Sequence, residues 1–281
     1  MSTEPSVPGA LFEPAGVDRW TATEWSRGPW DPEHCHGGPV AALLARAVEQ
    51  TGRGDVDWQV ARLTVELTRP VPVGRPLDLR ADVERPGRRV GLVAAGLSAG
   101  PTEVARVRGL RIRRDPLEAI ETPTSAMADE TTDGGEFPAP PEQSRLERPA
   151  FMGDGLEPVS FATRACEHRF AAGGWAEPGP VAVWIRLTVP VVPGEEPTGL
   201  QRTAAAADFG NGVSSVLPWD QFLFINPDLT VHLLRPADGE WIGLRAITRI
   251  GTQGAGLAQS SLHDVRGLVG RSLQSLFVAP R

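Results

Sequence analysis

The sequence of 281 residues contains no tyrosine and no lysine, so all 28 of its basic residues are arginine. We attribute both absences to the base composition of the gene. Only two cysteines occur, Cys35 and Cys166, which are too few for a disulfide framework. No apolar run approaches the roughly 18 residues of a membrane-spanning helix. The first residues also lack the basic and apolar regions of a signal peptide. We therefore expect a cytoplasmic protein with no membrane span.

The net charge of −7 is confined to one part of the chain. Residues 115–150 hold nine acidic and two basic residues, and −9 + 2 = −7, so the remainder is neutral. Neither half has the basic excess that would suggest nucleic acid as a partner. The acidic stretch includes Pro138-Ala-Pro-Pro141, and it predicts a partly disordered linker over residues 116–158. The linker separates an N-terminal domain, 1–115, from a C-terminal domain, 159–281.

The two halves repeat one pattern. Thr64, with Arg69-Pro70 after it, matches Thr230, with Arg235-Pro236 after it, at an offset of 166 residues. Each half also carries one alanine-rich segment with high helix propensity, over 37–48 and 200–209. Around these segments, apolar and polar residues alternate between short turns, which predicts an antiparallel meander of strands. We expect an α+β protein with two antiparallel sheets, each wrapped round a central helix.

The second alanine-rich helix ends with an acid, Asp208, followed by Gly210-Asn211-Gly212 as a stop signal. The matching helix of the first half has no such acid. Burial and the negative end of the helix dipole would raise the pKa of Asp208 and make it a better base. On a late strand, Gln274 lies between leucines and can orient a water molecule through its amide. Gln259 is the alternative glutamine for this role.

Before the first helix stands His34-Cys-His-Gly-Gly38. Neighbouring side chains diverge and no second His/Cys cluster is present, so we expect no metal site. Gly37 or Gly38 can present a backbone N–H at the helix N-terminus, where a substrate carbonyl oxygen would be polarised. A glycine turn that only lets the helix approach the sheet explains the same residues.

With these residues in place, the chain resembles the acyl-CoA thioesterase II family, the double-hotdog thioesterases. The resemblance rests on His36-Gly-Gly-Pro39, the two Arg-Pro pairs, Ala207-Asp208 and Glu240-Trp241. It implies hydrolysis of acyl-CoA without a cofactor, and it is compatible with a homo-oligomer. His36, Gly37 and Gly38 are the expected substrate-binding residues.

In that family an Asp, a Thr and a Gln position the attacking water, which the resemblance places on Asp208, Asn226 and Gln274. Asn226 departs from the family's threonine. Thr230 lies four residues later, where a strand period of two keeps it on the same face, so either residue could serve. The predicted catalytic set is therefore Asp208 and Gln274 with Asn226 or Thr230.

Two other functions stay open at this stage. A hotdog hydratase or dehydratase acting on acyl thioesters needs a histidine beside an acid, and the second half offers only His232 and His263 after its helix. A non-catalytic acyl-CoA-binding protein is favoured if the departure at Asn226 marks the loss of activity.

Overall fold

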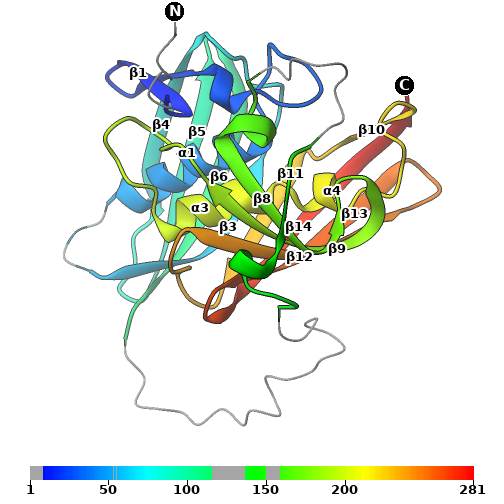
Figure 1. Cartoon of the computed structure of the whole chain (residues 1–281). Coiled ribbons are helices and arrows are strands. Elements are labelled where there is room, and N and C mark those ends of the chain that lie inside the picture. The colour runs from blue at the N-terminus through cyan, green and yellow to red at the C-terminus, as the bar shows by residue number, and fades with distance from the viewer. Residues whose placement is uncertain (1–8, 53, 55, 116–136, 150–158) are drawn as a thin grey trace, which may run out of the picture.

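A computed structural model of the chain describes residues 9–52, 54, 56–115, 137–149 and 159–281. Strands dominate it, and two helices pack together among them (Figure 1). The strands up to residue 113 are β1 (Phe12–Gly16), β2 (Arg19–Ala22), β3 (Trp58–Glu66), β4 (Pro76–Arg85), β5 (Val90–Ala99) and β6 (Thr102–Arg113). Those that follow are β7 (Arg145–Glu147), β8 (Cys166–Gly174), β9 (Glu177–Leu187), β10 (Phe222–Ile225), β11 (Asp228–Leu233), β12 (Trp241–Ile250), β13 (Ala255–Asp264) and β14 (Gly267–Pro280).

The helical segments are the α-helices α1 (Gly37–Gln50), α3 (Gly199–Ala207) and α4 (Gly210–Val213), the 3-10 turns η1 (Glu24–Ser26) and η2 (Pro141–Gln143), and the π-helical turn η3 (Phe161–Ala165). The two alanine-rich segments do form helices, as predicted. The predicted stop signal, Gly210-Asn211-Gly212, is not followed by an extended segment, because residues 210–213 form a further helical turn, α4. Asp208 and Phe209 connect α3 to α4.

The strands pair into one continuous 14-stranded sheet, whereas the sequence predicted two sheets. Its order is β1-β2-β4-β5-β6-β3-β11-β14-β13-β12-β9-β8-β7, with β10 paired to β14. The halves join where β3 and β11 pair antiparallel, with Val65 opposite Leu229. Each of these strands would otherwise leave one row of backbone N–H and C=O groups unpaired at an edge. Pairing the two edges satisfies both rows, which local sequence patterns cannot reveal.

The predicted meander holds for β4, β5 and β6 but not for β3. β3 pairs with β6, the last strand of its half, and not with β4, the next strand in the chain. Pro70 and Pro72 follow β3 and cannot donate backbone hydrogen bonds to a sheet ladder. The chain therefore leaves the sheet after β3 and returns at its other side.

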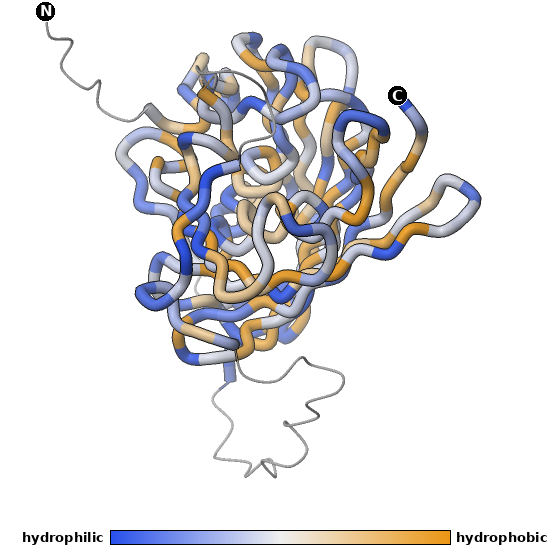
Figure 2. Tube along the Cα trace, turned by 45° about the vertical axis from the view of Figure 1, so that its right-hand side comes forward, coloured by the Kyte–Doolittle hydropathy of each residue, from blue (hydrophilic) through white to orange (hydrophobic). Residues whose placement is uncertain are grey.

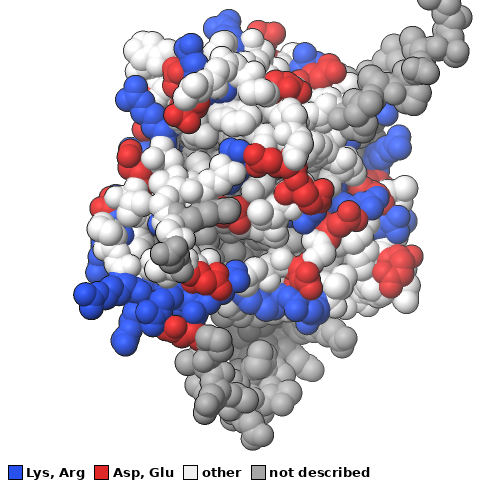
Figure 3. Space-filling model, turned by 90° about the vertical axis from the view of Figure 1, so that its left-hand side faces the viewer, with Lys and Arg blue, Asp and Glu red and all other residues white. Residues whose placement is uncertain are grey.

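Burial alternates along the strands, and the alternation of hydrophobic and hydrophilic residues is visible along the chain trace in Figure 2. α1 packs against β3, β5 and β6, and α3 packs against β9, β11, β12 and β13. The surface carries charges of both signs, with basic side chains gathered toward the lower edge of the face in Figure 3. Among the described residues, no helix is both long and apolar enough to cross a membrane.

The two helices pack on each other through small residues. Ala204, Ala205, Ala206 and Ala207 are all buried. A Cβ atom on Gly38 would lie 2.6 Å from the carbonyl oxygen of Ala205. These small side chains therefore let the two helices approach each other closely.

Part of the predicted linker belongs to the sheet. β7 pairs with β8, and the indole Nε1 of Trp184 donates to the carbonyl oxygen of Ala139 at 2.7 Å. Residues 116–136 and 150–158, for which we expected disorder, lie outside the described residues.

Candidate active site

The candidate site forms where the N-terminus of α1 meets the C-terminus of α3. His36 is the N-cap residue of α1, and Asp208 is the C-cap residue of α3. A Cβ atom on Gly37 would lie 2.7 and 2.8 Å from the two carboxylate oxygens of Asp208 and 2.8 Å from Leu67. Only a glycine allows this approach without displacing those atoms. The His-Gly-Gly sequence therefore brings the first half against the acid of the second.

Three side chains converge on the carboxylate of Asp208. Its Oδ2 lies 2.8 Å from Nδ1 of His36. Its Oδ1 accepts a hydrogen bond from Nδ2 of Asn226 at 2.7 Å and another from Nε2 of Gln274 at 3.2 Å. The side chain of Asp208 is 2% exposed and that of His36 is 13% exposed. Four of the residues predicted from the sequence thus meet at one buried point.

Gln274 is fixed at both ends of its amide. Nε2 also donates to the backbone oxygen of Asp208 at 3.1 Å, while Oε1 accepts from the backbone N–H of Asn211 at 3.1 Å. Asn211 belongs to α4. The segment that the sequence predicted as the end of the second helix therefore contributes a backbone N–H to the site. Gln274 contacts Asp208 on the side away from the adjacent cavity, because Gln274 is buried and does not line that cavity.

Of the two candidates for the middle position, the structure places only Asn226 beside Asp208. Pro227 separates Asn226 from β11 and breaks the strand period on which the alternative at Thr230 relied. Thr230 lies within β11, opposite Thr64 and Leu273, and it does not line the cavity. The prediction that Thr230 could serve equally well is therefore not supported by its position.

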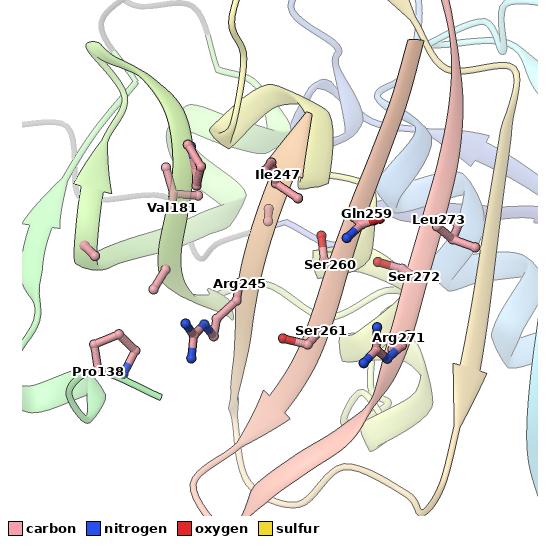
Figure 4. Close-up of a pocket in the computed structure, with 14 residues that line it drawn as sticks. Pro138, Val181, Arg245, Ile247, Gln259, Ser260, Ser261, Arg271, Ser272 and Leu273 are labelled. Atoms are coloured by element: carbon pink, nitrogen blue, oxygen red, sulfur yellow. The ribbon is translucent and has the colours of Figure 1, made fainter. Parts of the chain in front are cut away.

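Gln259, the alternative glutamine, faces a different surface. It lies on β13 opposite Ile247 of β12 and Leu273 of β14 (Figure 4). The pocket that Gln259 lines is formed mainly by the strands β9, β12, β13 and β14 and includes neither Asp208 nor His36. Gln259 is therefore separate from the candidate site.

The electrostatics of Asp208 differ from the prediction. Burial alone would raise its pKa, as we expected. The charge of His36, hydrogen bonds from His36 and Asn226, and the backbone N–H of Gly38 act in the opposite direction and outweigh burial. The pKa of Asp208 is therefore held below its usual value, and the carboxylate is ionised at neutral pH.

Nδ1 of His36 has two neighbours, the backbone N–H of Gly38 and the carboxylate of Asp208. The backbone N–H of Gly38 lies 3.1 Å from Nδ1 of His36, which caps α1. When Nδ1 carries a proton, it can donate to Asp208, and the backbone N–H of Gly38 also lies close enough to stabilise that carboxylate. When Nδ1 is unprotonated, it accepts from Gly38 instead. The pairing of His36 with Asp208 thus depends on where one proton resides.

A cavity of ≈ 450 Å³ opens beside these residues. His36, Gly37, Asp208 and Asn226 form its polar part. Its aromatic wall is made by Trp30, Trp219 and Phe224, whose rings pack with centroids 4.5–5.2 Å apart. A polar centre beside an aromatic wall is the usual make-up of a site for a small organic ligand.

Sequence reasoning missed the contact between His36 and Asp208. The signal was available in the small residues at the two helix ends, Gly37-Gly38 and Ala204–Ala207, which permit close packing. The neighbouring His34 pairs with Asp31 at 3.1 Å, and burial raises the pKa of the Cys35 thiol. Within the described part of the chain, no group of three or more His, Cys, Asp or Glu side chains is arranged to hold a metal ion.

Several solved structures share this architecture. A putative thioesterase II from Thermobifida fusca is 17% identical with a TM-score of 0.69, covering 97% of this chain and 99% of that one. A conserved protein of unknown function with a hot dog fold from Alicyclobacillus acidocaldarius has 15% identity and a TM-score of 0.68, covering 95% of each chain. A tesB protein of Mycobacterium avium has 15% identity and a TM-score of 0.64, covering 96% of each chain. These likenesses show a hotdog fold.

No curated protein matches the sequence. Two family profiles do match it: the acyl-CoA thioesterase N-terminal domain over residues 26–112 and the acyl-CoA thioesterase C-terminal domain over residues 133–278. The matched stretches contain both sides of the site, with His36 in the first and Asp208 in the second. The chain therefore belongs to the acyl-CoA thioesterase family of thioester hydrolases.

Proposed function

We propose that this protein hydrolyses acyl-CoA thioesters with a water molecule activated by Asp208. Two hotdog units, residues 1–115 and 159–281, joined by the segment 116–158, supply the site from opposite sides. The observation that carries the proposal is the buried carboxylate of Asp208, held by three side chains on the wall of a cavity.

In the proposed reaction, the carboxylate of Asp208 takes a proton from water while the oxygen of that water attacks the thioester carbonyl carbon. A general base of this kind contributes roughly 10²–10⁴-fold in rate. Asn226 lines the cavity and can orient the water, since its amide has both donor and acceptor atoms. Gln274 does not line the cavity and acts through Asp208, whose orientation it fixes.

The negative charge that develops on the carbonyl oxygen needs a hydrogen-bond donor. The backbone N–H of Gly37 is the proposed donor, because it lies at the N-terminus of α1 and the neighbouring Gly38 N–H is already engaged. A donor fixed at such a position is worth about 10²–10³-fold in kcat in other enzymes. The tetrahedral intermediate then collapses: its C–S bond breaks, and the proton held on Asp208 passes to the leaving sulfur, which gives the free acid and the thiol of CoA.

Thiol release from a panel of acyl-CoA substrates tests the proposal directly. We expect turnover by the wild-type chain and little turnover by Asp208→Asn. Absence of thiol release from every acyl-CoA tried, with the protein folded, would contradict it.

A second candidate is hydration of an unsaturated acyl thioester. The observation that favours it is the pairing of His36 with Asp208 at 2.8 Å, which supplies the histidine–acid pair that the second half lacks on its own. Hydration leaves the thioester bond intact. Loss of enoyl absorbance without thiol release would therefore identify it, and thiol release from saturated acyl-CoA would argue against it. A purely binding role is disfavoured by Asn226, which keeps a donor on Asp208 despite the departure from threonine.

A further inference from the structure

Two arginines occupy equivalent places in the repeat but have different surroundings. Arg69 follows β3 and Arg235 follows β11, and each precedes a proline at the offset of 166 residues. Arg235 makes a bidentate ion pair with Asp264, at 2.5 and 2.6 Å, and Asp264 is fully buried. Asp264 also accepts backbone N–H groups from Asp238 and Arg266. Arg235 therefore has a structural role in closing the end of β13.

The described residues of the first half offer Arg69 no such partner. Offsets of 166 and 165 residues from Asp264 lead to Ser98 and Ala99, and neither is an acid. Arg69 is exposed, and no carboxylate of the described residues lies within ion-pair distance of it. An arginine kept at a repeat position without its structural partner is available for another anion.

Arg69 also lines the cavity that holds Asp208. The segment that carries it begins at Leu67, which touches the position of a Cβ on Gly37 at the catalytic end. It continues to Val71, whose carbonyl oxygen accepts from the backbone N–H of Cys35 at 2.8 Å. Arg69 lies two residues beyond Leu67, about 7 Å along an extended backbone. Arg69 is exposed, whereas the side chain of Asp208 is 2% exposed, so we place the guanidinium at the mouth of the cavity, away from the catalytic carboxylate.

Other charged groups at the mouth do not compete for Arg69. Asp31 and His34 line the same cavity and pair with each other at 3.1 Å. Arg69 is therefore a cation without a carboxylate partner among the described residues, in a cavity whose aromatic wall is formed by Trp30, Trp219 and Phe224. A guanidinium is suited to bind phosphate through two parallel hydrogen bonds.

We propose that Arg69 binds a phosphate group of the CoA moiety, while the acyl group lies against the aromatic wall. This assignment rests on the proposed function, because it orients the thioester so that its carbonyl carbon faces Asp208. The rival anion is a carboxylate at the far end of an acyl chain. We favour phosphate because an exposed arginine at the mouth lies where the polar end of the substrate remains in solvent.

The test compares an acyl-CoA with the same acyl group on N-acetylcysteamine, a thiol that has the end of the CoA arm but no phosphate. Arg69→Gln should raise KM for the acyl-CoA roughly tenfold or more, the range for a hydrogen bond to a charged group, with kcat little changed. It should not change kcat/KM for the N-acetylcysteamine thioester. The wild-type KM for acyl-CoA should rise with salt, and the variant should show a smaller rise.

Two controls separate recognition from folding. Arg75→Gln removes another exposed arginine that precedes a proline but does not line the cavity, and both substrates should behave as with wild type. Arg235→Gln should lower the melting temperature and leave the ratio of the two kcat/KM values unchanged. Equal losses on both thioesters in Arg69→Gln would overturn the proposal. A loss confined to thioesters whose acyl chain ends in a carboxylate would also overturn it.

Failure of the proposed function has a different signature. If wild-type protein hydrolyses neither thioester, titration calorimetry with CoA itself still tests Arg69. Weaker binding of CoA by Arg69→Gln, with binding by Arg75→Gln unchanged, supports the assignment. Unchanged binding by Arg69→Gln overturns it.

Discussion

Nδ1 of His36 lies 2.8 Å from Oδ2 of Asp208, although the first residue belongs to the N-terminal half of the chain and the second to the C-terminal half. Neither half contains the pair by itself. The contact depends on the glycines after His36, which let the start of α1 approach the end of α3. One site is thus formed from residues of both halves of the chain.

Removing the charge of His36 should shift the pH dependence of the enzyme upward on its acid side. In the folded protein the pKa of Asp208 lies below its ordinary value, about 3.9, so the base stays ionised down to lower pH. In His36→Gln the charge and its hydrogen bond are lost, while burial still raises the pKa. The acid limb of the kcat/KM profile should therefore move to higher pH, and an unmoved limb would contradict the role given to His36.

The same shift predicts a change in stability. Because the pKa of Asp208 is lower in the folded state than in the unfolded state, its contribution to stability is present above the unfolded value and is lost as pH falls through the folded value. Chemical denaturation between pH 3 and pH 7 should show this acid-side loss in wild type. The loss should be smaller in Asp208→Asn, whose side chain does not titrate.

The two glycines of α1 should respond differently to alanine. In Gly37→Ala the new methyl group meets both oxygens of Asp208, so we expect a large loss of kcat. In Gly38→Ala it meets the carbonyl oxygen of Ala205 and the ring of Phe161, so the cost falls on helix packing, about 1–3 kcal/mol. Thermal melts beside kinetics separate the two. Full activity of Gly37→Ala would show that catalysis does not need the close approach of Gly37 to the carboxylate of Asp208.

Much of this site could be predicted from the sequence because its residues carry strong local signals. The alanine-rich helices, the His-Gly-Gly turn and the acid at Asp208 came from pattern and spacing, whereas the roles of Asn226 and Gln274 came from the resemblance to the thioesterase family. The pKa of Asp208 was predicted to be raised, whereas it is lowered. The prediction took account of burial and of the helix end, but not of His36, which is distant in sequence. The pairing of β3 with β11 was missed for a similar reason, because the pairing of two edge strands does not change the hydrophobic pattern of either strand.

The two glutamines offer a matched comparison. Gln274→Ala removes a donor from Asp208 and an acceptor from the Asn211 N–H, so we expect a loss of up to about 3 kcal/mol in transition-state stabilisation. Gln259→Ala changes only the pocket on β9, β12, β13 and β14 and should retain activity. The losses of Gln274→Ala and Asp208→Asn should not add, because both residues act on the same carboxylate. Additive losses would place Gln274 in a separate role.

Asn226 and Thr230 form a second comparison. Asn226→Thr keeps a donor near Asp208 and should leave activity equal or higher, whereas Asn226→Leu removes the donor and should reduce kcat. Thr230→Ala should have no effect on kcat, because Thr230 lies outside the cavity. Loss of turnover in Thr230→Ala, at unchanged melting temperature, would return the middle position to Thr230.

The central claim is that Asp208 is the base, and the most direct measurement is the turnover of Asp208→Asn on the best acyl-CoA substrate. The substitution keeps the shape of the side chain and removes its basicity. We predict a fall in kcat of roughly 10²–10⁴-fold, with the protein still folded as judged by its melting temperature and circular dichroism. Wild-type turnover by a folded Asp208→Asn protein would contradict the account and place the base elsewhere.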